Sequence, residues 1–119
     1  AELAPLARSI ADMDAALAQN ALEEWAEADQ RFHSALVDLS GNSRAQMIFA
    51  MMSDQVRRAR AVTLFMRPPP LQSNADHRRV YEAIKSGNAE EGASVHRDHR
   101  VRAKEILLCL LEKHKLSRV

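Results

Sequence analysis

Residues that break helices occupy only a few short stretches of this chain. Its 119 residues include three Gly and four Pro, and three of the prolines are consecutive, Pro68 to Pro70. Aromatic residues, which favour strands, make up only 4%. A chain with so few breakers is predicted to form long helices that end at those stretches. Apolar residues amount to 46% and charged residues to 28%, as in a globular helical domain.

Between the breakers, apolar residues recur every three or four positions, which is the period of a one-sided helix. Helices are predicted over residues 1–18, 20–39, 43–66, 73–86 and 88–113, with a flexible tail over 114–119. Asn20 and Asn88 are expected to cap the second and fifth helices, because an asparagine side chain accepts hydrogen bonds from a first turn. The predicted fold is all-α, an antiparallel bundle of five to six helices in one domain, residues 1–113.

Charge and cysteine content indicate which partners and which cellular compartment to expect. A formal net charge of +1 gives no general attraction to nucleic acid. Cys109 is the single cysteine and lies in an apolar run, so a buried free thiol and a cytoplasmic location are expected. No stretch approaches the roughly 20 apolar residues of a membrane span. Because the chain starts without Met inside a predicted helix, we interpret it as a piece of a longer protein.

Asp29 and His33 are spaced by four residues, so their side chains project from one face of the second predicted helix. Downstream, a tight turn is predicted at Gly87, with His77 before it and His96 and His99 after it. At about 1.5 Å per residue, His77 is expected level with both later histidines in an antiparallel helix pair.

Helix phase favours His99 over His96, though not decisively, because His99 shares a stripe with Val95 and Ile106. One carboxylate and three imidazoles suit a divalent ion such as zinc, nickel or manganese. The pattern Asp-x-x-x-His also recurs by chance, and histidines of helical proteins often lie on the surface. Spacing alone therefore leaves both interpretations open.

The same residues resemble a known family. Residues 29–33, Asp-Gln-Arg-Phe-His, followed by Ser-Gly-Asn at 40–42, are similar to a signature of the FCD domain. That domain is the C-terminal effector-binding part of the FadR subfamily of GntR-type bacterial transcription regulators. Residues 76–88 resemble the family's Glu-His-x-x-Ile-x-x-Ala-Ile-x-x-Gly-Asp run, and the family's last histidine falls at 99. Departures are Asp76 for Glu, Asn88 for Asp and Gly92 for Ala. The likeness covers residues 1–111.

The resemblance implies a function and a ligand set. Asp29, His33, His77 and His99 match the four family ligands of a divalent metal in the bundle interior. Coordination positions left open take water or a small organic acid, such as lactate, citrate or a sugar acid. A winged helix-turn-helix DNA reader and one further helix are expected to precede this segment in the intact protein, which is expected to be a homodimer.

Arg58 is predicted to contact the acid, because it shares a partly apolar stripe with Asp54 and a guanidinium binds carboxylate in bidentate fashion. An ordinary solvated ion pair is the alternative, and Arg60 is the second choice.

Two other functions remain open. An Asp/His₃ ion could activate water in a hydrolase, but Glu82, five residues past His77, points elsewhere and no general base is evident. The chain could also be a structural dimerisation module. Ligand sensing without catalysis is the favoured interpretation.

Overall fold

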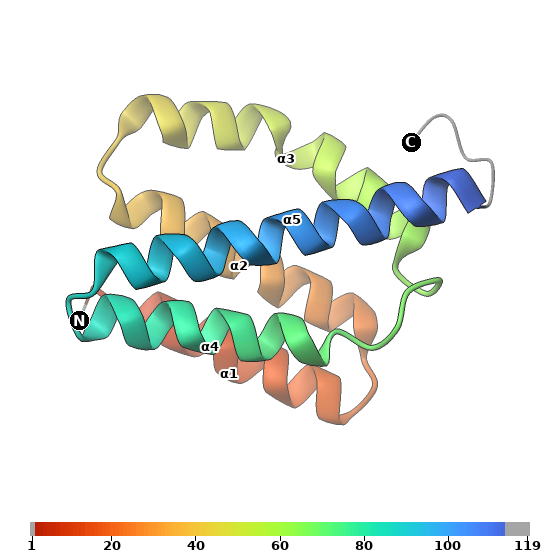
Figure 1. The fold of residues 1–119 in the computed structure, drawn as a ribbon, viewed down its shortest axis with the longest axis horizontal. Coiled ribbons are helices and arrows are strands. Elements are labelled where there is room, and N and C mark those ends of the chain that lie inside the picture. Colours follow the sequence, from red (N-terminus) through yellow and green to blue (C-terminus); the bar gives the residue numbers. More distant parts are fainter. Residues whose placement is uncertain (1, 114–119) are drawn as a thin grey trace.

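Five α-helices joined by short connections make up the part of the chain that the structure, a computed structural model, describes, residues 2–113. The prediction of an all-α bundle is confirmed (Figure 1). The flexible tail predicted over 114–119 lies outside the described residues. The helices are α1 (Ala4–Ala18), α2 (Leu22–Leu39), α3 (Ser43–Thr63), α4 (Leu71–Lys85) and α5 (Ala89–Lys113).

Three asparagines lie at the helix ends and have two different roles there. Asn42 accepts from the backbone amides of Arg44 and Ala45 and caps α3, and Asn88 accepts from the amide of Glu91 as predicted. The prediction that Asn20 caps α2 is wrong. Asn20 has a φ of 55° and instead ends α1 in the left-handed conformation that asparagine tolerates. The backbone of the next residue then closes the end of α1 with a 2.8 Å hydrogen bond to Ala16.

The hydrophobic core lies between α1, α2 and α4, with a contribution from the start of α5. α1 packs against both α2 and α4, and α4 forms an antiparallel hairpin with α5. Trp25 and Phe32 are buried in this core. The other buried apolar members of the cluster are Leu6, Ile10, Met13, Ala16, Ala28, Leu64, Val80 and Val95.

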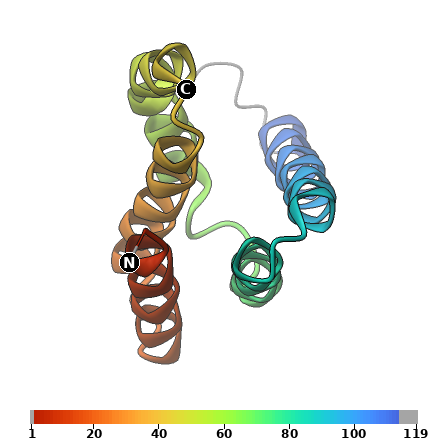
Figure 2. The same cartoon turned by 90° about the vertical axis from the view of Figure 1, so that its left-hand side faces the viewer.

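The remaining part of the fold is more open. α3 buries only Thr63, and α5 buries no described residue after His99. Figure 2 shows α1, α2 and α3 forming one wall and α4 and α5 the other. Cys109, on this open part of α5, is exposed, so the expectation of a buried thiol is wrong. Over residues 2–113, no helix combines the length and apolarity that crossing a membrane requires.

Candidate metal centre

Asp29 and His33 project from α2 beside the core residue Phe32. Asp29 is only 3% exposed, and its Oδ1 lies 3.4 Å from Nε2 of His33. The four-residue spacing places both on one face of the helix, as the sequence indicates. Burial of Phe32 turns this face of α2 toward the interior. A buried carboxylate therefore lies beside an imidazole at the edge of the core.

His77 comes from α4 and meets this pair from the opposite wall. It is fully buried, and its Nε2 lies 2.7 Å from Oδ1 of Asp29. The His77 ring stacks on Phe32 with 4.2 Å between ring centroids and an interplanar angle of 24°. Packing against Phe32 thus fixes the plane in which His77 presents its nitrogens.

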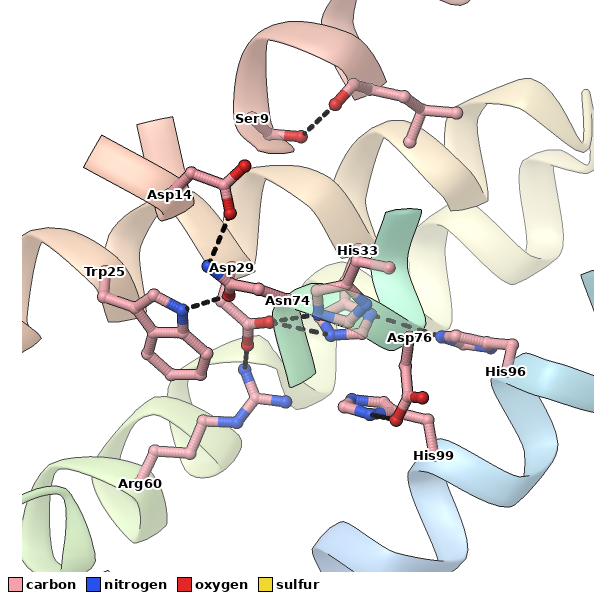
Figure 3. A network of polar contacts seen from close by, with 12 residues as sticks. Ser9, Asp14, Trp25, Asp29, His33, Arg60, Asn74, Asp76, His96 and His99 are labelled. Carbon is pink, nitrogen blue, oxygen red and sulfur yellow. Dashed lines mark hydrogen bonds and ion pairs between the residues drawn. The ribbon is translucent and has the colours of Figure 1, made fainter. Parts of the chain in front are cut away.

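His99, and not His96, completes the group. One ring nitrogen each from His33, His77 and His99 lies within 4.8 Å of the others, which is a spacing that could hold a metal ion. The His77 and His99 ring centroids are 4.6 Å apart. His96 lies at the margin, where its Nε2 is 3.4 Å from Nδ1 of His33 (Figure 3). Two features account for this arrangement. His77 and His99 lie level with one another in the α4–α5 hairpin, and the helical phase of α5 directs His99, more than His96, toward the cluster.

In two of the imidazoles, Nδ1 has a polar neighbour. Nδ1 of His99 lies 3.2 Å from Oδ2 of Asp76, which is fully buried, and Nδ1 of His33 faces His96. A carboxylate can only accept, so Nδ1 of His99 carries the proton and Nε2 keeps its lone pair. Asp76 is itself held by Gln72, whose Nε2 donates over 2.9 Å, and by Arg102.

Two buried nitrogens of the cluster lack hydrogen-bond partners among the described residues, Nε2 of His33 and Nδ1 of His77. Burying such groups unpaired is unfavourable unless another partner satisfies them. Imidazole nitrogens together with the carboxylate of Asp29 are donors that zinc, nickel and manganese accept. The residues present therefore fit a divalent metal.

The electrostatics of the cluster keep the groups in forms that bind cations. Burial would raise the pKa of Asp29, but His33, the hydrogen bond from His77 and the charge of Arg60 hold that pKa well below its usual value. Burial lowers the pKa of His77 and of His99. At neutral pH, Asp29 is ionised while His77 and His99 are neutral, which is the state that coordinates metals.

A cavity of about 640 Å³ opens beside the cluster, between α2, α3 and α5. His33 and His99 line it, whereas Asp29 and His77 do not. Four basic residues also line it, and no Asp or Glu within residues 2–113 does. The four basic residues are Arg60, Arg67, Arg100 and Lys104, and much of the remaining wall is apolar, including Leu36, Val37, Ile48, Phe49, Met52, Val56, Leu107 and Leu110.

Of the two arginines considered from the sequence, Arg60 is the one at the cluster. Its Nη1 donates to Oδ2 of Asp29 over 2.7 Å, and it lines the cavity. Arg58 is exposed and does not line the cavity. Arg60 lies on the flank of α3 nearest α2, outside the partly apolar stripe that Arg58 shares with Asp54, so the sequence pattern ranks it second.

Sequence reasoning missed three other residues at this site. In the sequence, Asp76 stands out only as a departure from a family motif, although its place directly before His77 is a signal for a role near the histidines. Arg67 precedes the prolines in an irregular segment, where helix phase has no meaning, and its Nε is buried without a partner among residues 2–113. Arg100 follows His99 directly and carried no periodic signal.

The arrangement combines a buried donor set for a cation with an adjoining cavity of positive charge that suits an anion. A family model, described as the FCD domain, matches residues 1–102. Neither the search of curated proteins nor the search of solved structures gives a match.

Proposed function

This chain belongs to the FCD domain family, and from that premise we propose that it is the effector-sensing and dimerisation domain of a metabolite-responsive GntR-type transcription regulator. The FCD domain is a regulatory domain and not a catalytic one. In such a regulator, DNA contacts belong to a separate N-terminal winged helix-turn-helix domain, and the protein acts in the cytoplasm as a homodimer.

We further propose that Asp29, His33, His77 and His99 hold one divalent metal ion, which is zinc, nickel or manganese. The observation that carries this proposal is the buried cluster itself, in which three imidazoles lie beside the carboxylate of Asp29 and two ring nitrogens lack hydrogen-bond partners among the described residues. Burial of unpaired polar atoms is otherwise unfavourable. When bound, the metal supplies positive charge and open coordination positions at the floor of the cavity.

The effector is proposed to be a small organic acid bound between the metal and the basic side chains. Arg60 is the proposed carboxylate contact in place of Arg58, because Arg60 reaches the cluster and lines the cavity. Arg60 is paired with Asp29 in the structure. A carboxylate that enters the cavity can bind the side of this guanidinium that faces away from Asp29. A bound metal can neutralise the charge of Asp29.

Metal analysis tests the proposal directly. The chain, produced without an affinity tag and without chelators, is expected to contain about one equivalent of metal per chain by mass spectrometry of the elements. His77→Ala and His99→Ala are expected to lose it, whereas Asp12→Asn, which alters an exposed carboxylate paired with Arg31, retains it. Substoichiometric metal that these histidine substitutions leave unchanged contradicts the metal site.

A screen of carboxylic acids by thermal shift separates sensing from the alternatives. A sensor is stabilised by particular acids, and each acid is recovered chemically unchanged. Conversion of the acid favours a metal-dependent hydrolase instead. A chain that binds neither metal nor acid is a structural dimerisation module.

A further inference from the structure

α3 carries a second face that the candidate metal centre does not use. On the side opposite the cavity lies a stripe of six residues, which we call the outer stripe. Three of its apolar side chains are mostly exposed, Met47 by 62%, Met51 by 71% and Phe65 by 68%. Such large apolar side chains grouped on one helix face are typical of an interaction surface. The outer stripe consists of Met47, Met51, Asp54, Arg58, Ala61 and Phe65, the last of these in the turn just past the helix.

The spacing of the outer stripe defines the kind of partner. Its members follow at intervals of four, three, four, three and four residues, which is the seam of a two-helix coiled coil. The stripe is apolar at both ends and has one acid and one base in its middle. Within residues 2–113, neither Asp54 nor Arg58 forms an ion pair.

We propose that the outer stripe is the dimer seam, on which α3 of a second copy packs antiparallel about a two-fold axis level with Val56. In this register Met47 faces the partner's Phe65, and Met51 faces the partner's Ala61. Asp54 faces the partner's Arg58, and symmetry repeats each contact. The proposal deepens the homodimer of the proposed function, but it does not depend on the metal or the effector.

Charge selects this register over the others. In a parallel pair, Asp54 would face its own copy and so would Arg58, which places like charges together. Shifting the antiparallel pair by one heptad places Asp54 against Phe65 or Arg58 against Met47. A charge enclosed at an interface without a partner is strongly unfavourable. Only the register centred on Val56 pairs both charges and keeps the apolar ends in contact.

The position of α3 leaves room for a second copy. α3 contacts α2 and α5, and it lies at a corner of the fold, away from α1 and α4 (Figure 2). Cavity-lining residues such as Met52, Val56 and Thr63 lie on the other side of the helix. The seam can therefore form without closing the histidine cluster.

Charge reversal tests the seam and its register together. Sedimentation equilibrium of the chain over micromolar concentrations is expected to show a dimer. Asp54→Arg or Arg58→Asp alone should raise the dimer dissociation constant about 100-fold or more, because each places two like-charge pairs in the seam. The double variant, Asp54→Arg with Arg58→Asp, restores opposite charges and should recover most of the affinity. Asp12→Arg, at an exposed carboxylate of α1, is the matched control and should change nothing.

Three results would overturn the proposal. They are a wild-type chain that stays monomeric, single reversals that leave the dimer intact, or a double reversal that fails to restore it. Circular dichroism of each variant establishes that the helices are retained. Metal content measured on the same samples should be equal in all variants, so a failure of the seam is distinguished from a failure of the metal site.

Discussion

Replacing Asp76 by Asn is expected to weaken metal binding about 10- to 100-fold while leaving the chain folded. Asp76 is fully buried, and its Oδ2 accepts from Nδ1 of His99 over 3.2 Å. The carboxylate keeps the proton on Nδ1 and so leaves Nε2 free to coordinate. An asparagine amide donates as well as accepts, so the substitution removes this preference and also removes the negative charge behind His99.

The size of the effect follows from the contact that is lost. A hydrogen bond to a charged group contributes about 1.5–3 kcal/mol, and about 1.4 kcal/mol corresponds to ten-fold in a dissociation constant. Loss of the whole bond therefore corresponds to about 10- to 150-fold. The cost to folding is limited to about 1–3 kcal/mol, because the Arg102 side chain is 46% exposed and regains water.

Isothermal titration calorimetry with Ni²⁺ or Zn²⁺ at pH 7.5 measures the affinity, and urea denaturation measures stability. Asp12→Asn, at an exposed ion pair, serves as the control and should leave the metal dissociation constant within about two-fold. Long-range ¹H–¹⁵N spectra of the imidazoles report which His99 nitrogen carries the proton. The reasoning is refuted if Asp76→Asn binds metal as tightly as the wild type while His99→Ala does not bind.

Other perturbations address the cavity, the histidines and the metal. Arg60→Gln should weaken binding of a stabilising carboxylic acid about ten-fold or more, whereas Arg58→Gln should not, as measured by calorimetry on metal-loaded protein; equal effects would contradict the role of Arg60. For the metal-free chain, denaturation at a series of pH values should show stability falling as pH decreases from about 6.5 to about 4. The sign follows because three histidines have pKa values lowered by burial, so the unfolded chain binds more protons in this window; they are His77, His99 and His96, whose pKa falls to about 4. A flat profile would count against these shifts. Removing metal with a chelator should lower the melting temperature, and so should acidification below about pH 6, where protons compete for the imidazoles; metal retained at about pH 4.5 would contradict histidine ligation.

Much of the fold could be predicted because helix period and breakers agree over most of the chain. The turns at Gly41 and Gly87, with φ of 66° and 80°, occur where the sequence indicates. Asn20 shows the limit of such reasoning, since the same side chain can begin a helix or end one by adopting a positive φ. Local pattern does not distinguish the two roles. Backbone hydrogen bonds at the end of α1 decide it here.

Part of the candidate site could be anticipated for geometrical reasons. Asp29 and His33 are one turn apart, and a short hairpin turn fixes the level of His77 relative to α5. These relations are local, so spacing and phase suffice to propose them. The contact of Asp76 with His99 is not predicted, and Arg60 ranks only behind Arg58, because each role depends on how one helix is rotated against another. Tertiary packing sets that rotation, and a single sequence does not reveal it.

α3 is shared between two surfaces, since one side lines the cavity and the other carries the outer stripe. If the seam forms as proposed, any effector that shifts α3 also changes how two copies fit together. Thermodynamic linkage then requires the reverse, so that association of two chains changes effector affinity by the same factor. Apparent effector affinity would depend on protein concentration, and the amount of the regulator in a cell would help to set the metabolite level at which it responds.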